Sequence, residues 1–195
     1  MANSIYSRLA RPAASENPLL IKPQRPLRNS DTRYAVGDFF SENGVEGVVY
    51  EVWDGGEHGR IVSLDEATLA WSKEVFMAGA TSTTDGDSNT DKVLARADYE
   101  KSPAFIWCRE HGADWYLPAI DELAALLLDQ EVFDAVNKTL EERGAKKLID
   151  YNLNRICWSS TEHDERCAHN VYMNSHHTNF NYKRYDCRVR AVAKF

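Results

Sequence analysis

The segment "WYLPAIDELAALL", residues 115–127, carries the strongest helix signal in the chain. Pro118 suits the first turn of a helix, and the carboxylates of Asp121 and Glu122 favour the positive end of the helix dipole. An apolar stripe follows at three- to four-residue spacing, formed by Leu123, Leu126 and Leu127. The spacing therefore predicts a helix with one buried face, and the fold prediction is built outward from it.

Further helices are predicted on both sides of this segment. Residues 97–112 have an apolar side with Ala104, Trp107 and Cys108, and they end at Gly112. Residues 130–144 form a third helical piece. Ser63 is a candidate cap for a helix over 64–76, in which Leu64, Ala67, Trp71 and Val75 share a face, whereas the polar residues 78–93 predict a loop.

Short β-type runs surround these helices. They cover residues 34–40, 47–53, 59–64, 155–161, 168–173, 178–183 and 188–195. Helices within a frame of short strands predict an α+β domain over residues 31–195, with the N- and C-terminal strands of the domain paired. Residues 1–30 contain four of the six prolines and no periodicity, which predicts an extended N-terminal arm for attachment or homo-oligomerisation.

Composition excludes several classes of partner. The net charge of −7 gives no general electrostatic attraction to nucleic acid or to an anionic membrane. No apolar run approaches the roughly 20 residues that span a bilayer, and the first residues lack the apolar core of a secretory signal. We therefore expect no nucleic-acid partner, no membrane span and no signal peptide in this chain.

Several motifs together resemble a known family. The chain contains "WYLPAIDEL" (115–123), "CWSSTE" (157–162) and "RVRAVAKF" (188–195), with "HGRIVSLDEATLAWS" (58–72) and "DGDSNT" (85–90) upstream. Across about residues 34–195 these resemble the C-type-lectin-like domains of variable proteins from diversity-generating retroelements. A related pattern occurs in the C-terminal domain of the Legionella collagen-like adhesin. The family often has Thr where this chain has Ala119, so a side-chain helix cap is missing there, and usually has Tyr where this chain has Cys157.

The resemblance implies a C-type-lectin-like fold and a hypervariable region, and the composition of residues 163–187 agrees with the latter. Retroelements of this kind mutate adenines, and Asn codons randomised at their adenines yield Asn, His, Tyr, Asp, Ser, Cys, Arg and Phe, but not Lys, Glu or Met. Asn, His, Tyr, Cys, Asp and Arg fill 17 of the 25 positions, and only Glu165, Met173 and Lys183 break the rule. Ala168, Val171, Met173 and Val189 recur in and just after this region, where a strand needs buried side chains.

These observations predict recognition without chemistry, so the chain is expected not to be an enzyme and to need no cofactor. The partner class is a protein or glycan receptor on a target cell, and the place of display is a phage tail or a cell surface. The predicted ligand-binding, variable residues are His163, Asp164, Arg166, Cys167, His169, Tyr172, Asn174, Ser175, His176, His177, Asn179, Phe180, Asn181, Tyr182, Arg184, Tyr185 and Asp186.

Three alternatives remain open. One is a surface adhesin domain that is not diversified, and another is a metal-binding enzyme that shares the fold of formylglycine-generating enzymes. The third is a metal site drawn from Cys167, His169, His176, His177 and Cys187, but these have no paired ligand spacing, so no metal is expected.

The remaining cysteines and hydroxyls have scaffold interpretations. Cys108 is predicted to be buried, and Cys167 and Cys187 to be solvent-accessible and not bridged. Cys157 is either a variable position or a partly buried substitute. The resemblance makes Trp158 a core residue and the hydroxyls of Ser159, Ser160 and Thr161 caps for nearby backbone groups. Arg188 and Arg190 are expected to pair with carboxylates.

Overall fold

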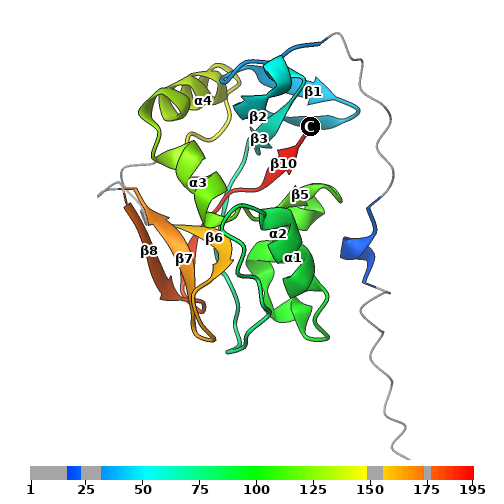
Figure 1. Cartoon of the computed structure of the whole chain (residues 1–195), viewed down its shortest axis with the longest axis vertical. Coiled ribbons are helices and arrows are strands. Elements are labelled where there is room, and N and C mark those ends of the chain that lie inside the picture. The colour runs from blue at the N-terminus through cyan, green and yellow to red at the C-terminus, as the bar shows by residue number, and fades with distance from the viewer. Residues whose placement is uncertain (1–16, 23–31, 149–155, 174–176) are drawn as a thin grey trace, which may run out of the picture.

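The computed structural model describes residues 17–22, 32–148, 156–173 and 177–195, and it has an α+β architecture with two sheets (Figure 1). The first sheet has the order β1-β2-β3-β10-β5, and the second has the order β4-β9-β6-β7-β8. The strands of the first sheet are β1 (Phe39–Glu42), β2 (Val45–Trp53), β3 (His58–Val62), β5 (Trp115–Tyr116) and β10 (Val192–Lys194). Those of the second are β4 (Ala67–Ala70), β6 (Ile156–Glu162), β7 (Cys167–Tyr172), β8 (His177–Tyr182) and β9 (Asp186–Val189).

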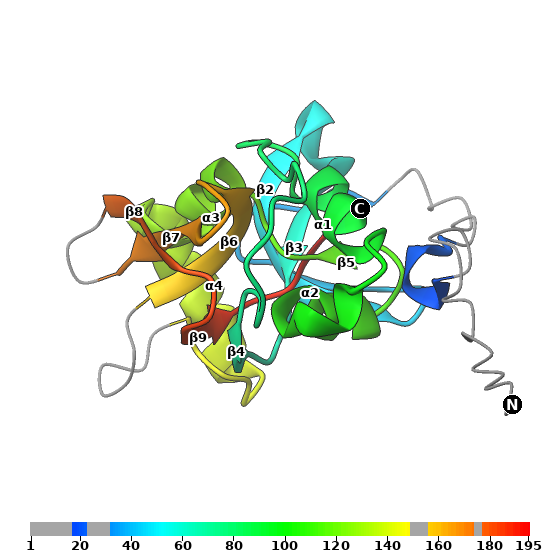
Figure 2. The same ribbon diagram turned by 90° about the horizontal axis from the view of Figure 1, so that it is seen from below.

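Helices connect the two sheets. They are α1 (Gly86–Leu94), α2 (Pro103–Glu110), α3 (Ile120–Leu127) and α4 (Gln130–Glu142), with short 3₁₀ turns η2 (Pro18–Leu20), η3 (Asp54–Gly56) and η4 (Tyr99–Lys101). Helix α3 contacts β2 of the first sheet and also β6 and β7 of the second, while α1 contacts β5 and β6 (Figures 1 and 2). The helices over 103–110, 120–127 and 130–142 confirm three of the predicted ones.

The apolar core consists of two clusters. In the first, the rings of Trp71 and Phe105 meet edge to face at 4.6 Å, and Trp158 is fully buried beside them. The second lies around α3, where the predicted stripe of Leu123, Leu126 and Leu127 is buried against β2 and β7. Burial of these large side chains supplies most of the stabilisation of such a domain.

The end of the chain links the two sheets. The single strand predicted over 188–195 is two strands, because β9 pairs with β4 and β6 while β10 pairs with β3 and β5. The prediction that the first and last strands of the domain pair is therefore wrong. The hairpin of β2 and β3 lies between them, so β1 is an edge strand and β10 is an inner strand of the same sheet.

The helix predicted over 64–76 is also wrong. Residues 67–70 form β4, which pairs with β9 in the register Leu69↔Cys187. Trp71 is buried, but Val75 is 63% exposed, so the helical spacing of the apolar residues does not correspond to a buried face. Pairing with a strand more than one hundred residues away outweighs the local preference.

Conversely, nearly all of α1 lies within the predicted loop over 78–93. Asp85 is its N-cap, since the side chain accepts from the N–H of Ser88 at 3.2 Å. Gly86 begins the helix where another chain segment passes closely. A Cβ there would lie 2.5 Å from the backbone nitrogen of Ala119, so only glycine fits.

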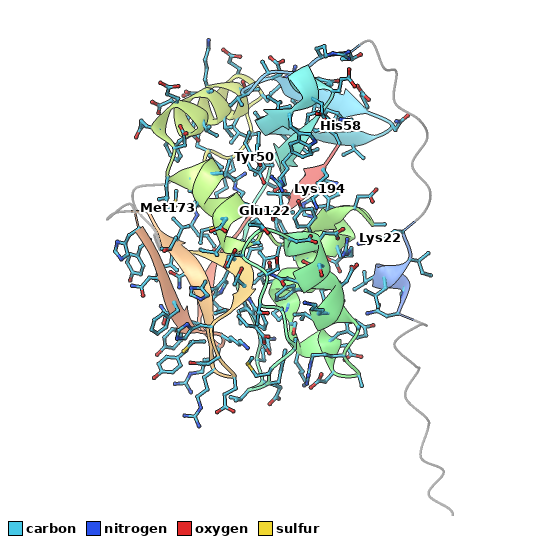
Figure 3. The ribbon with its side chains drawn as sticks, in the orientation of Figure 1. Lys22, Tyr50, His58, Glu122, Met173 and Lys194 are labelled. Carbon is cyan, nitrogen blue, oxygen red and sulfur yellow. The ribbon has the colours of Figure 1, made fainter. Side chains whose placement is uncertain are left out.

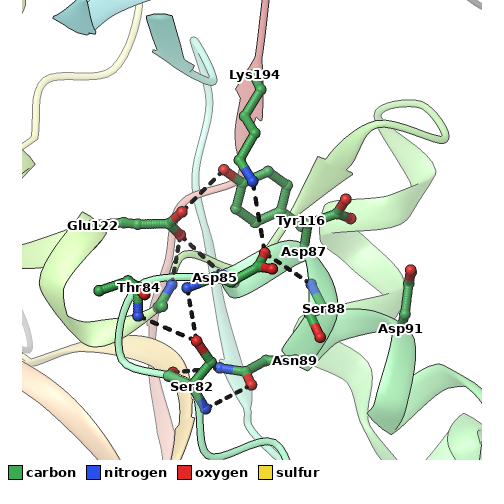
Figure 4. A network of polar contacts seen from close by, with 12 residues as sticks. Ser82, Thr84, Asp85, Asp87, Ser88, Asn89, Asp91, Tyr116, Glu122 and Lys194 are labelled. Carbon is green, nitrogen blue, oxygen red and sulfur yellow. Dashed lines mark hydrogen bonds and ion pairs between the residues drawn. The ribbon is translucent and has the colours of Figure 1, made fainter.

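The start of α3 shows how the missing cap at Ala119 is replaced. Glu122 Oε2 accepts from the N–H of Ala119 at 2.9 Å and of Gly86 at 3.2 Å, which ties the starts of α3 and α1 together (Figure 4). Thr161 Oγ1, from β6, accepts from the N–H of Ile120 at 3.0 Å. Burial raises the pKa of Glu122, which lies in the middle of the molecule (Figure 3).

Part of the predicted N-terminal arm is described, and this part contacts the domain. Asn17 is buried, and its Nδ2 donates to the carbonyl of Leu94 at 2.7 Å. Lys22 pairs with Asp87 and Asp91, both at 2.8 Å. The rest of residues 1–30 lies outside the described residues. In the described part of the chain, no helix is both long and apolar enough to cross a bilayer.

Candidate ligand-binding surface

The predicted variable residues gather at one edge of the second sheet. They lie on β7, on the edge strand β8, in the turn 163–166 between β6 and β7, and at 184–186 where the chain leaves β8 for β9. In Figure 1 this edge is at the lower left, away from the C-terminus and from η2. Asn174, Ser175 and His176 lie outside the described residues.

Exposure separates the predicted set from the scaffold around it. Nearly all of its described members are exposed or half-buried: His163, Asp164, Arg166, His169, Tyr172, His177, Asn179, Phe180, Asn181, Tyr182, Arg184, Tyr185 and Asp186. Ala168, Val171 and Met173 between them, and Val189 after them, are buried, as predicted. Along β8, however, exposure does not alternate, because this strand extends beyond the core on both faces.

The prediction that Cys167 and Cys187 are solvent-accessible is wrong. Cys187 is 1% exposed and lies in the first core cluster, opposite Leu69 of β4, whereas Cys167 is 9% exposed at the start of β7. Cys108 is fully buried, as predicted, and Cys157 is 3% exposed beside Val171 in the second cluster. All four are free thiols. Burial raises the pKa of Cys167 and raises that of Cys157 to about 11.

Two of the three residues that break the codon pattern are buried scaffold. Met173 is 5% exposed and packs in the cluster around α3. Lys183 is 2% exposed, and its Nζ donates to Glu162 Oε1 at 2.7 Å and to the carbonyl of Phe76 at 2.8 Å. The third, Glu165, is exposed, but its carbonyl accepts from the N–H of Phe76 at 3.2 Å. Each of the three therefore has a structural partner.

Aromatic and imidazole rings form one cluster on this surface. The ring of His163 stacks on Phe180 at 4.0 Å with an interplanar angle of 5°, and it meets His169 edge to face at 5.1 Å. His169 and Phe180 are direct cross-strand neighbours. Burial, and then the neighbouring His163, lower the pKa of His169. Phe180 is nevertheless 48% exposed, so the cluster offers apolar contact area to a partner.

A second pair of rings lies on the opposite face of β7 and β8. Tyr172 and His177 are opposite one another in the ladder, and their rings stack at 6.0 Å. They stand three residues from His169 and Phe180 respectively, which places them on the other face. The predicted surface therefore wraps around the sheet edge.

The turn 163–166 is held by one of the predicted binding residues. Asp164 Oδ1 accepts from the N–H groups of Arg166 and Cys167, each at 2.7 Å. These hydrogen bonds lower the pKa of Asp164, and the bond from Arg166 has the largest effect. A shape-determining role for Asp164 was not visible in the sequence.

The hydroxyls of Ser159 and Thr161 bond to backbone groups, as predicted, whereas that of Ser160 bonds to a side-chain amide. Ser159 Oγ donates to the carbonyl of His169 at 2.8 Å, and Thr161 Oγ1 donates to that of Ser82 at 2.8 Å. Ser160 Oγ accepts from Asn89 Nδ2 at 3.2 Å. Trp158 is fully buried in the core, which confirms its predicted role.

Arg188 and Arg190 also pair as predicted. Both guanidinium groups contact the carboxylate of Glu66, and Arg190 further donates to the carbonyls of Ser63, Lys146 and Lys147. Within the described residues, no group of three or more His, Cys, Asp or Glu side chains is placed to hold a metal ion.

Sequence reasoning missed a pocket next to this surface. It has a volume of about 500 Å³ and is lined by Lys73, Glu74, Val75, Arg166, Tyr182, Lys183 and Arg184. Three of these are predicted variable residues, whereas residues 73–75 follow β4 and belong to the segment 64–76 for which the sequence predicts a helix. The pairing of β4 with β9 brings the two groups close together in space.

Comparisons with known proteins show a structural likeness but no match in sequence. No family model matches the chain, and no curated protein matches it. A solved structure described as a fimbrial protein from Bacteroides ovatus has a similar fold, with a TM-score of 0.54 at 17% sequence identity. The match covers 70% of this chain and 36% of the fimbrial protein, so the chain spans about a third of that protein's length. At this level of identity the likeness concerns the fold.

Proposed function

We propose that this protein recognises a macromolecular target on a cell surface through a diversified surface, and that it catalyses no reaction there. The diversified surface consists of the exposed and half-buried predicted residues on and around β7 and β8. The observation that carries the proposal is their separation from the scaffold, since the described members are accessible except Cys167, while the aliphatic residues and the methionine between them (Ala168, Val171 and Met173) are buried. Such a separation lets binding residues change without loss of the fold.

The origin of the diversity is proposed to be a retroelement acting on Asn codons. The composition of residues 163–187 supports this origin. It is also supported by the positions of two of the three residues that such mutagenesis cannot produce, because these two belong to the scaffold and are not expected to vary. Met173 and Lys183 are buried scaffold residues, where change would be costly. The buried Cys167 and Cys187 are accommodated because a thiol is small and apolar enough for a core position.

The surface has the composition of a paratope. Tyr and Phe rings provide contact area at a small cost in side-chain entropy, and Asn, His and Arg provide adaptable hydrogen bonds. One small patch rarely contains many strongly contributing residues, so a single copy is expected to bind weakly. Several copies on one phage tail or cell surface, attached through residues 1–30, would raise the overall affinity through avidity.

The scaffold is proposed to be a C-type-lectin-like domain. Two sheets joined by helices, with the end of the chain passing from one sheet to the other, are compatible with that fold. The motifs that support this assignment have structural functions. Thr161 and Glu122 cap α3, and Trp158 fills the first core cluster.

A second candidate is a surface adhesin domain whose binding residues are not diversified. The fold likeness to a fimbrial protein favours it, because that protein belongs to a surface structure by its description. Both candidates place the chain on a surface and give it a binding function. They differ only in whether the residues on β7 and β8 vary among sibling genes.

Sequencing the neighbouring DNA and sibling genes tests the proposal. We expect a reverse transcriptase gene and a near-copy of the 3′ coding segment with Asn codons at the variable positions. Siblings should differ within residues 163–187 and agree at Ala168, Val171 and Val189. Differences spread evenly over residues 34–195 would rule out diversification, and an unvarying surface would favour the adhesin.

A further inference from the structure

The pocket of about 500 Å³ beside β8 is bounded by three chain segments that main-chain hydrogen bonds connect. The N–H of Ser72 donates to the carbonyl of Lys183 at 3.1 Å, and the N–H of Lys183 donates to that of Arg166 at 2.8 Å. These bonds connect the segment after β4, the end of β8 and the turn before β7, which are the three walls of the pocket. Its volume lies within the roughly 300–1,000 Å³ typical of small-ligand sites.

Cations predominate in the pocket. Its lining contains Lys73, Arg166, Lys183 and Arg184 against the single carboxylate of Glu74, although the whole chain has a net charge of −7. The charge of Lys183 is compensated by Glu162.

The other three cations of the lining are available to a ligand; they are Lys73, Arg166 and Arg184. Arg166 contacts Glu165 at 3.3 Å in an exposed pair, which contributes little and can be exchanged. No carboxylate in the described part of the chain lies within ion-pair distance of Lys73 or Arg184. Guanidinium groups hold carboxylates in paired, charge-assisted hydrogen bonds, so this cluster suits an anionic ligand.

Exposed rings flank these cations. Tyr182 is 47% exposed and Tyr185 is 44% exposed, and the two rings meet edge to face at 5.6 Å. The guanidinium of Arg184 lies 5.7 Å from the centroid of each ring. A sugar ring has an apolar C–H face and a rim of hydroxyls, and it therefore matches flat aromatic surface beside hydrogen-bonding groups.

The edge of β8 argues against an extended peptide as the ligand. The N–H of Phe180 is bonded to Oδ1 of Asn179 at 2.8 Å, and the N–H of Tyr182 is bonded to Oδ1 of Asn181 at 2.9 Å. A peptide that adds a strand to a sheet edge needs main-chain donors of this kind. Because side chains already satisfy them, a ligand in the pocket would be recognised through side chains.

We propose that this pocket binds an acidic sugar residue of a glycan, with its carboxylate at Arg166, Arg184 and Lys73 and its ring against Tyr182. The proposal rests on the proposed function, since it names the ligand class for part of the diversified surface. Lys73 comes from outside the variable segment, so the preference for an anion is partly retained among siblings, while residues 166, 182 and 184 adjust which sugar fits.

Titration of the full chain with D-glucuronic acid, followed by two-dimensional NMR, tests the proposal, with D-glucose as the uncharged matched probe. We expect saturable shifts for the backbone of residues 182–184 with glucuronate, and a much weaker response with glucose. The double variant R166A/R184A should raise the Kd for glucuronate by about tenfold or more, because it removes charge-assisted hydrogen bonds. R143A, which removes an exposed arginine at the C-cap of α4, should leave the Kd unchanged.

Three outcomes would overturn the proposal. They are equal binding of glucose and glucuronate, no saturable shift at residues 182–184, and tighter binding of an acidic Glu-rich peptide than of glucuronate. Failure here leaves the proposed function intact if sibling genes vary within residues 163–187. Conversely, siblings that are identical there would overturn the proposed diversification even if glucuronate binds.

Discussion

The Nζ of Lys183 lies 2.7 Å from Oε1 of Glu162, and both side chains are almost completely buried. Glu162 also accepts from the N–H groups of Ala78 and Ala80, and the ammonium group lies 4.4 Å from the centroid of the Trp71 ring. This pair thus links the turn after β8 to β6 and to the segment after β4, and it positions the base of the diversified surface.

Removal of one partner of this pair should strongly destabilise the protein. Lys183→Met leaves the Glu162 carboxylate buried without its cation, which costs about 3–5 kcal/mol in comparable pairs. Urea denaturation measures the change in free energy of unfolding. The double variant K183M/E162Q should lose less than the sum of the two single variants, because neither charge is then left unpaired. A loss below about 1 kcal/mol for K183M would contradict the structural role.

The core and the surface should respond oppositely to truncation. Trp158→Ala should cost about 3–5 kcal/mol, because the ring is fully buried in the first cluster. The triple variant H177A/N179A/Y182A should change stability by no more than roughly 0.5 kcal/mol per site, since these side chains are exposed on β8. Thermal and urea melts compare the two, and the reverse order would mean that the assignment of surface and core is wrong.

Local signals in the sequence were sufficient for the helices with a strong apolar stripe. Those over 120–127 and 130–142 could be predicted because Leu123 and Leu126 recur at helical spacing and Gly144 ends the second. The strand at 67–70 could not, because it exists through pairing with β9, and its leucine and alanines also fit a helix. Helix α1 was missed because its sequence is polar, with Val93 and Leu94 as its buried aliphatic residues.

The candidate site was predictable in composition but not in shape. The accessible residues of 163–187 could be identified from their skew toward Asn, His and Tyr. Burial of Cys187 depended on its register with Leu69, and the pocket depended on residues 73–75 lying beside Arg184. Contacts between segments so far apart in the chain leave no local pattern.

The cysteines should be protected in the native protein. Cys108, Cys157 and Cys187 are at most 3% exposed, and burial raises the pKa of Cys108 and of Cys157, so little thiolate is present near neutral pH. Labelling with a thiol reagent should be slow before unfolding and reach four groups per chain afterwards. Cys167, at 9% exposure, should react first, and C167S should remove that first phase. Rapid native labelling of two or more thiols would contradict the burial.

The imidazole cluster should make stability depend on pH. The pKa of His169 is lowered from its ordinary value of 6.5, first by burial and then by His163. The unfolded chain therefore binds this proton more readily, so the stability linked to His169 is complete above pH 6.5 and is lost as the pH falls through the folded-state pKa. NMR titration of the imidazoles should show a resonance that titrates below that value and is absent in H169Q. A midpoint above 6.5 for this resonance would refute the prediction.

The amides of Asn179 and Asn181 should protect the edge of β8 from self-association. Edge strands with free main-chain donors pair with other chains, and here the N–H groups of Phe180 and Tyr182 are bonded to these two side chains. The variant N179A/N181A frees both donors without adding a large apolar side chain. We expect sedimentation velocity to show dimers or larger species of this variant, in amounts that increase with protein concentration. The parent chain should show no such increase.

H177A/T178A, which changes the same strand but keeps both amides, is the matched control. If this control associates as strongly as N179A/N181A, loss of polar surface rather than exposure of the strand edge is the cause, and the protective role of the asparagines is refuted.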